Sequence, residues 1–147
     1  MSTQNETISQ RVIEEIWNAR RLEIVDELIA TSFTHHDPNT PDLGTGPDAY
    51  KKLVSLYIQA FPNLHFSIEE TVSAGDTVVI RWKSTGTQSG DLPGVPATQK
   101  AVSIEGVTIS HLQNGKVINQ WVSWDALGMM RQLGVISKAA ETKDRAA

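Results

Sequence analysis

The chain has 147 residues, a net charge of −4 and a charged fraction of 20%. This length suits one compact domain with a hydrophobic core, and the lack of a Lys/Arg cluster argues against nucleic-acid or membrane-surface partners. Disulfides, thiolate nucleophiles and Cys-ligated metals are excluded because no cysteine is present. No apolar run approaches about 18 residues and the first ten residues lack a signal-peptide pattern, so we expect a cytoplasmic protein.

Helices are predicted for the first part of the chain. Apolar residues at helical spacing predict a helix over 7–19 and a short second helix over 22–29. The segment 34–48 is rich in Pro, Gly and Asp and is predicted to be a loop, entered by a short strand at 33–35. A proline in the first turn and an apolar stripe then predict a third helix over 47–61.

After residue 62 the apolar period changes from 3.6 to 2, which is typical of strands. Four strands are predicted, over residues 64–69, 76–87, 101–112 and 116–124. A final amphipathic turn at 127–133 precedes a polar tail, 137–147, that we expect to be loose. The order of elements predicts a single α+β domain, 1–147, with its core over about 8–136 and helices covering one face of a curved sheet.

Four stretches of the chain resemble one known family. They are "HHDPN" at 35–39, "AFPNLHFSIEE" at 60–70, "GDTVVIRWKSTGTQSGDLPGVPATQK" at 75–100 and "DALGMMRQLG" at 125–134. Together they resemble the SnoaL-like polyketide cyclases, which are ester cyclases of the NTF2-like superfamily. The resemblance implies an NTF2-like cone, in which N-terminal helices pack on the concave face of a curved mixed or antiparallel sheet. It also implies an intramolecular aldol ring closure of a polyketide-type ester without any cofactor.

The resemblance implies three catalytic candidates. Asp125 matches the family's acid/base aspartate at the end of the last long strand, and His111 matches a pocket histidine fourteen positions earlier. His35 falls where relatives often carry Asn or Asp. Burial against Trp121 and Trp124 would raise the pKa of Asp125 towards neutrality, where a general base works best. The alternative is that Asp125 only caps the helix that follows it.

The predicted ligand is a small apolar or aromatic molecule that contains a carbonyl group. Large rigid side chains are suited to bind it. The predicted binding residues are Trp17, Leu53, Tyr57, Trp82, Ile109 and Trp121. Either His35 or His36 enters the pocket, since adjacent strand residues point to opposite faces. A metal site at His35, His36 and Asp37 is therefore not expected.

The turn between the last two strands decides which side chains share a face. A two-residue turn at Asn114-Gly115 places His111 and Asp125 on opposite faces. A three-residue loop over 113–115, or a bulge with the same effect, places them on one face. Interpretation as a cyclase requires the second arrangement.

Functions of three kinds remain open. The first is an acid/base enzyme, a cyclase or a related lyase, isomerase or hydrolase. The second is a non-catalytic carrier or sensor of small molecules, and the third is an oligomerisation module. A deep cavity with a buried Asp125 favours catalysis, a deep cavity with Asp125 bonded only to helix amides favours a carrier, and a filled cone favours the module. The half-exposed sheet face predicts a homodimer or homotetramer.

Overall fold

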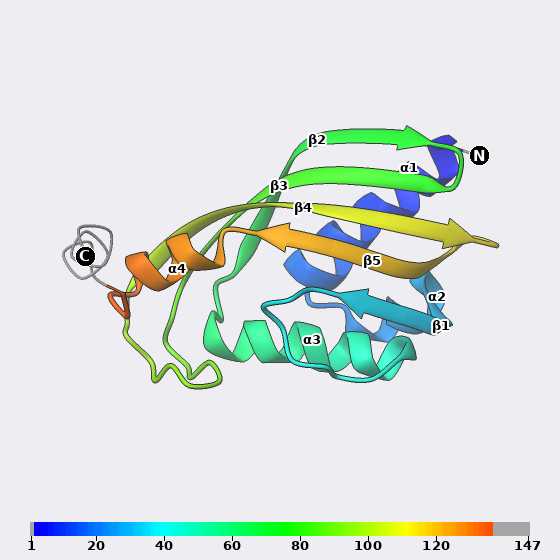
Figure 1. Ribbon diagram of the computed structural model, residues 1–147. Helices are drawn as coiled ribbons and strands as arrows, with labels where there is room; N and C mark the ends of the chain where they lie inside the picture. Colours follow the sequence, from blue (N-terminus) through cyan, green and yellow to red (C-terminus); the bar gives the residue numbers. More distant parts are fainter. Residues whose placement is uncertain (1, 137–147) are drawn as a thin grey trace.

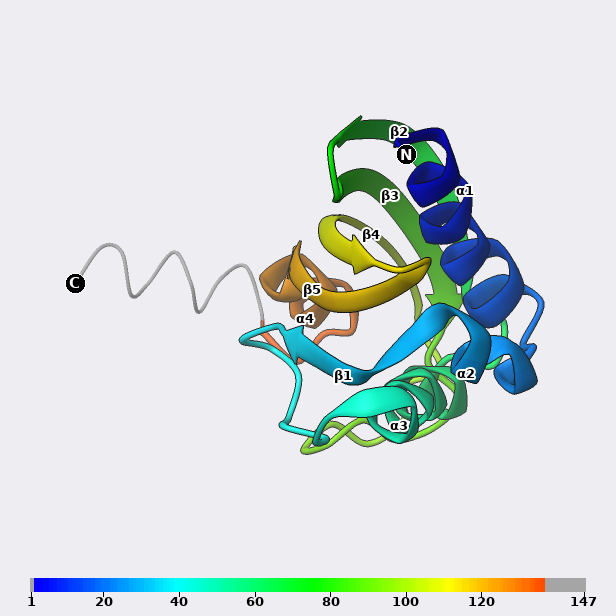
Figure 2. The ribbon, with the colours of Figure 1, turned by 90° about the vertical axis from the view of Figure 1, so that its right-hand side faces the viewer.

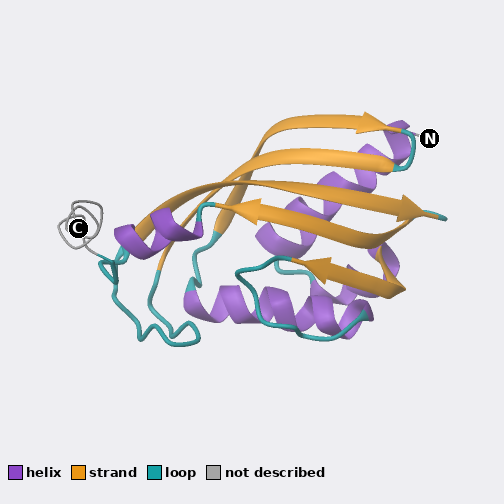
Figure 3. Ribbon diagram, viewed as in Figure 1, coloured by secondary structure: helices purple, strands orange, loops and turns teal. Residues whose placement is uncertain are grey.

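A curved sheet of five strands forms one layer of the computed structural model, which describes residues 2–136 (Figure 1, Figure 3). The strands are β1 (Ile29–His36), β2 (His65–Ala74), β3 (Thr77–Thr87), β4 (Ala101–Gln113) and β5 (Lys116–Trp124). Their order in the sheet is β1-β5-β4-β3-β2. β1 runs parallel to β5, and the other neighbours are antiparallel. The predicted α+β class with a curved mixed sheet is confirmed.

The helices, apart from the last one, lie on the concave side of the sheet (Figure 2). They are α1 (Ser2–Arg11), η1 (Val12–Asn18), η2 (Leu22–Ile24), α2 (Val25–Leu28), α3 (Gly46–Ala60) and α4 (Ala126–Gln132). α1 packs against β2 and β3, and α3 packs against β1. No helix among residues 2–136 is long and apolar enough to cross a lipid bilayer.

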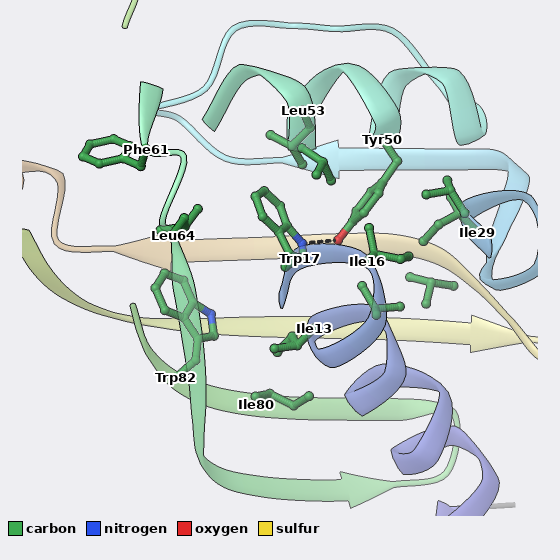
Figure 4. Packing of buried hydrophobic residues seen from close by; sticks show 14 of the residues in the cluster. Ile13, Ile16, Trp17, Ile29, Tyr50, Leu53, Phe61, Leu64, Ile80 and Trp82 are labelled. Carbon is green, nitrogen blue, oxygen red and sulfur yellow. Dashed lines mark hydrogen bonds between the residues drawn. The ribbon is translucent and has the colours of Figure 1, made fainter. Parts of the chain in front are cut away.

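Alternation along β3 shows where the core sits. Val78, Ile80, Trp82 and Ser84 are buried on the concave face, whereas the intervening side chains are more exposed. Buried residues of η1 and α3 close over this face, as Figure 4 shows for Trp17, Tyr50 and Leu53 and their neighbours. The apolar stripe of each helix and the alternate positions of each strand that face the helices therefore build one core.

Several element boundaries differ from the sequence-based prediction, among them that of β2, which was predicted over 64–69 and runs to Ala74. The first helix begins at Ser2, not at residue 7, and its second half is the π-helical segment η1. The second helix ends at Leu28, and the strand predicted only at 33–35 starts at Ile29. β1 is extended because it pairs with β5, which is almost ninety positions away in the sequence and leaves no local signal. The predicted loose tail, 137–147, lies outside the described residues.

The β4–β5 hairpin combines a tight turn with a bulge. Asn114 and Gly115 have φ values of +53° and +76°, and Gln113 pairs with Lys116, which is a two-residue turn of the I′ type. The register then shifts, so that His111 faces Asn119 and not the residue before it. Beyond this bulge, the odd-numbered residues of both strands, 107–111 and 119–123, lie on one face, as the three-residue loop would have arranged them.

Candidate functional site

A cavity of about 110 Å³ lies between the concave face of the sheet and the helices. Its walls come from all five strands, η1 and α3, with one residue each from α1 and α4. The lining is mostly apolar, and the space is several times the 10–15 Å³ or so that one water molecule needs. The core of this domain is therefore not completely filled, which argues against a purely structural module.

Five aromatic side chains, which we call the aromatic girdle, form a series of ring contacts along the cavity wall. Successive ring centroids are 6.2 Å apart for Trp124–Tyr57, 6.4 Å for Tyr57–Trp17, 5.2 Å for Trp17–Phe66 and 5.0 Å for Phe66–Trp82. All five line the cavity. These spacings are typical of favourable aromatic pairs; the Tyr57–Trp124 and Phe66–Trp82 pairs are edge-to-face, and the other two are tilted. The girdle is therefore a packed unit in which each ring limits the movement of the next.

Trp17 and Trp82 are also held by hydrogen bonds. The indole Nε1 of Trp17 donates to the hydroxyl of Tyr50 at 2.8 Å (Figure 4). The indole Nε1 of Trp82 donates to the hydroxyl of Thr108 at 2.9 Å. Burial raises the pKa of Tyr50, so its phenol stays protonated at neutral pH. Both rings consequently have one defined orientation.

Three polar side chains, which we call the polar row, cross the sheet on the cavity face. His35 of β1 is opposite Gln120 of β5, and Gln120 is opposite Ser110 of β4. The amide of Gln120 donates to the hydroxyl of Ser110 at 3.1 Å. All three line the cavity, and Gln120 and Ser110 are buried. The polar row therefore gives an otherwise apolar cavity one wall that can bind oxygen atoms.

His35 has two buried ring nitrogens without a hydrogen-bond partner. A buried polar group normally has a partner, because an unpaired one costs about 1–3 kcal/mol. His35 faces the cavity, whereas His36 points to the other face and stacks on Trp121 with ring centroids 4.0 Å apart. Of the two histidines between which the sequence did not decide, His35 is the one that enters the pocket.

Asp37 is the nearest charged group to His35, with 3.9 Å between His35 Nε2 and Asp37 Oδ2. Three donors hold its carboxylate: the amide of Asn39 at 2.9 Å, the hydroxyl of Thr40 at 2.8 Å and the indole of Trp124 at 2.8 Å. The separation from His35 is too long for a hydrogen bond but short enough for electrostatic attraction.

The balance of burial and donors keeps Asp37 ionised. Burial acts to raise the pKa of the Asp37 carboxyl, but the imidazole of His35 and the donors of Asn39, Thr40 and Trp124 outweigh it. The pKa of Asp37 is therefore below its ordinary value. At neutral pH a fixed negative charge stands beside an imidazole that faces an apolar cavity.

Asp125 does not occupy the environment that we expected. Its side chain is exposed, does not line the cavity, and accepts a hydrogen bond from the amide of Gly128 at 2.8 Å. The expectation that Asp125 is buried beside the tryptophans is wrong. Trp124 turns into the cavity, and the next residue, at the end of β5, begins α4. The alternative, a helix N-cap, describes what Asp125 does in the structure.

Three further predicted residues lie on the convex face of the sheet, outside the cavity lining. His111 contacts the side-chain oxygen of Asn119, and Ile109 and Trp121 pair with each other across the strands. The prediction that His111, Ile109 and Trp121 line a pocket is wrong. The bulge places them on one face with Asp125, as interpretation as a cyclase required, but that face is the outer one.

The other predicted binding residues lie where we expected them. Trp17, Leu53, Tyr57 and Trp82 all line the cavity. The sequence did not identify Gln120 and Ser110 of the polar row, and it did not identify Asp37 as a partner of His35. The spacing of two residues between His35 and Asp37 was an available signal, because positions i and i+2 of an extended chain face the same side. Among residues 2–136 no cluster of three metal-ligating side chains occurs.

Comparison with known proteins shows the family to which the chain belongs. The model of the SnoaL-like polyketide cyclase family matches residues 7–133. The chain belongs to the SnoaL-like polyketide cyclase family. This SnoaL-like protein is 29% identical to aklanonic acid methyl ester cyclase DnrD of Streptomyces peucetius over 137 residues. The aligned part is 91% of this chain and 92% of that relative.

Solved structures share the fold of this SnoaL-like protein. A structure from Jannaschia sp. CCS1, described as a SnoaL-like polyketide cyclase, has a TM-score of 0.84 and 25% identity over 92% of this chain and 95% of its own. A structure from Acidithiobacillus ferrooxidans, described as a polyketide cyclase, has a TM-score of 0.81 and 31% identity over 93% and 99% of the two chains. The predicted NTF2-like fold is confirmed.

Proposed function

We propose that this protein is an acid/base catalyst that closes a ring within a carbonyl-containing ester, and that His35 is its base. The observation that carries the proposal is the buried imidazole of His35, which faces the cavity with both nitrogens unpaired and lies 3.9 Å from the ionised Asp37. A substrate placed between the polar row and the aromatic girdle would supply the missing partner. DnrD is named as a methyl ester cyclase, which supports an ester of the polyketide type as the substrate class.

The chemistry follows from these groups. A nitrogen of His35 removes the proton from a carbon that lies between two carbonyl groups. The electron pair left on that carbon attacks a second carbonyl of the same molecule, which forms the ring C–C bond and an alkoxide. The imidazolium then returns the proton to the alkoxide, so that a neutral imidazole is restored. The carboxylate of Asp37 stabilises the imidazolium and acts as a positioning residue.

Proton removal can be measured without knowledge of the natural substrate. Ethyl benzoylacetate carries a CH₂ group between a ketone and an ester, and its exchange with D₂O is followed by proton NMR. We expect the wild-type protein to accelerate this exchange above the rate in buffer. His35→Gln should reduce the acceleration by about 10²–10⁴-fold, the usual contribution of a general base.

The matched control is Asp125→Asn, which keeps a capping side chain outside the cavity and should exchange at the wild-type rate. The proposal is refuted if Asp125→Asn removes the acceleration while His35→Gln retains it. The CD spectrum and unfolding midpoint of both variants establish that each is folded.

The second candidate function is a non-catalytic carrier. It is favoured by one observation: Asp125 is bonded to a helix amide and not to the cavity, an arrangement that we associated with carriage. A carrier would bind ethyl benzoylacetate, as titration calorimetry would show, but it would leave the exchange rate at that of buffer. The same pair of measurements therefore separates the two functions.

A further inference from the structure

Ser9 is the residue of α1 that lines the cavity, and its hydroxyl is buried without a partner. The residue is 3% exposed, and its Oγ makes no hydrogen bond. Within a helix a serine hydroxyl normally points to solvent or bonds to the carbonyl four residues earlier, and Ser9 does neither. Alanine would suit the helix better at this position. The hydroxyl therefore contributes nothing to the stability of the fold, which raises the question of what it binds.

Among residues 2–136, only Ser9 and His35 have buried side-chain polar atoms without a hydrogen-bond partner, and both line the same cavity. The polar atoms of the aromatic girdle are all engaged. Its three indoles donate to Tyr50, Thr108 and Asp37, and the hydroxyl of Tyr57 is bonded to Thr40. The two unpaired residues are thus the places where the cavity can still gain hydrogen bonds.

Side-chain contacts fix where Ser9 lies along the sheet. α1 packs on β2 and β3. The hydroxyl of Ser73 donates to the carboxylate of Glu6, and the amide of Gln10 donates to the hydroxyl of Thr71 at 3.4 Å. α1 therefore runs along β2, and Ser9 lies between these two contacts.

This position is level with the polar row. Ser73 pairs with Val78 of β3, and Val78 pairs with Ser110 of the polar row, which ends at His35 on β1. Adjacent strands are about 4.8 Å apart, so β1 and β3 are about 14 Å apart in a flat sheet, and the curvature shortens this distance on the concave side. Ser9 and His35 consequently face the cavity from opposite sides at the same level.

The neighbouring level of the sheet is occupied by ring atoms. Trp82, four residues after Val78, lies directly against the backbone of β4, because a Cβ atom at Gly106 would lie 2.4 Å and 2.5 Å from two atoms of its indole. The bond to Thr108 holds the ring in that position. This level offers apolar contact, so the polar atoms of a ligand pair at the level of Ser9 and His35.

We propose that Ser9 binds a second oxygen-bearing group of the ligand, a carbonyl or a hydroxyl, on the side of the molecule away from the carbon that His35 deprotonates. Ser9 is a positioning residue and takes no part in proton transfer. The inference rests on the proposed function only in placing the dicarbonyl end of the ligand at His35. A ligand without the second oxygen leaves the hydroxyl of Ser9 buried and unpaired.

The test compares two β-keto esters with chains of similar length, dimethyl 3-oxohexanedioate and methyl 3-oxooctanoate. The first chain ends in a second ester and the other in an alkyl group. Titration calorimetry measures their dissociation constants for wild type and Ser9→Ala. We expect Ser9→Ala to bind the diester about fivefold more weakly, the order expected for one hydrogen bond between neutral groups. Its affinity for the octanoate should change less than twofold.

The exchange of protons with D₂O gives a second readout. In Ser9→Ala the KM for the diester should rise by the same factor while kcat stays within twofold of wild type, as expected when a residue binds the substrate without acting on the reacting carbon. Thr7→Ala is the matched control, because this hydroxyl lies exposed on the same helix and donates to the carbonyl of Thr3 at 3.0 Å. It should bind both esters as the wild type does.

Ser9→Ala should also unfold in urea at a midpoint no lower than that of wild type, because it removes an unpaired hydroxyl and introduces a better helix former. A hydroxyl that only holds a structural water would give a lower midpoint and an unchanged ratio of the two dissociation constants. That result overturns the inference. Equal weakening of both esters, or failure of both to bind the wild type, overturns it as well.

The role of Ser9 and the proposed function can fail separately. If His35→Gln still accelerates exchange but Ser9→Ala selectively loses the diester, the base assignment fails and the role of Ser9 stands. If His35→Gln is inactive but Ser9→Ala binds both esters as the wild type does, the base assignment stands and the role of Ser9 fails.

Discussion

At the scale of single residues, two aspartates next to tryptophans have opposite surroundings. Asp125 follows Trp124 in the sequence but is exposed and caps α4. Asp37 is 87 positions away from Trp124, accepts a hydrogen bond from its indole, and has a side chain only 4% exposed. Adjacency to a tryptophan in the sequence therefore does not predict the environment of a carboxylate. The direction of the Trp124 indole determines that it contacts Asp37 and not Asp125.

The cap at Asp125 leads to a stability prediction. Asp125→Ala should lower the free energy of unfolding by about 1 kcal/mol, because the amide of Gly128 loses its acceptor. Asp125→Asn should change it by much less, since Asn is also a good cap. Urea unfolding at pH 7 measures both, and binding of ethyl benzoylacetate by both variants should equal that of the wild type. Loss of binding in Asp125→Ala would contradict the assignment.

The hydrogen bonds of Asp37 predict a pH-dependent effect. The pKa of Asp37 is lower in the folded protein than its ordinary value near 3.9, so its stabilising contribution is complete above about pH 5 and is lost as the pH falls through the folded value. Asp37→Asn should therefore cost about 1.5–3 kcal/mol at pH 7, the usual range for hydrogen bonds to a charged group. Urea unfolding should show this difference shrinking below pH 4. A difference that is equally large at pH 3 would be evidence against an ionised, hydrogen-bonded Asp37.

The histidine of the site could be found from the sequence, whereas its partners could not. His35 was a candidate because the family resemblance places it where relatives often carry Asn or Asp. Gln120 and Ser110 are ordinary polar residues in strands, and they become a site only through pairing with β1 and β4. Such pairing depends on contacts between distant segments, which a single sequence does not specify.

At the scale of elements, the hydrophobic period predicted most helices and strands correctly. The switch from a period of 3.6 to a period of 2 after residue 62 corresponds to the change from α3 to β2. The Asn114-Gly115 turn was also visible, because this dipeptide favours positive φ at both positions. The bulge after the turn was not, since twist and packing of the whole sheet determine where a strand gains a residue.

That bulge shows how much one inserted residue can change. It brings Trp121 onto the outer face beside His111, and Gln120 onto the cavity face beside Ser110. The parity argument was correct about which residues share a face. It could not identify the inner face, because both faces of β5 carry a large aromatic residue.

At the scale of the whole molecule, the convex face carries a continuous apolar row. Val72, Val79, Ile109 and Trp121 are opposite one another in adjacent strands, from β2 to β5. Trp121 is 53% exposed, and Val72 and Ile109 are exposed as well. An exposed apolar row of this length is typical of a contact surface. The homodimer expected from the sequence stays a prediction, with this row as its centre.

Self-association can be tested by sedimentation equilibrium. The wild-type protein should sediment as a dimer, and Trp121→Lys should shift it towards the monomer, because a two-fold contact would bring two of the introduced charges together. Leu127→Lys is the control, since Leu127 is similarly exposed but lies on α4. A wild-type protein that is monomeric, or a Leu127 variant that dissociates equally, would contradict the prediction.

The close approach of Trp82 to Gly106 also limits which residues the two positions can carry during evolution. A sequence that acquires a side chain at position 106 has to give up the indole at position 82, because both cannot occupy the same space. Among diverging relatives the two positions should therefore covary. Trp at position 82 should accompany Gly at position 106, and a smaller residue at position 82 should accompany a larger one at position 106. A paired exchange of this kind would change the shape of the cavity that Trp82 lines, while the polar row stays intact.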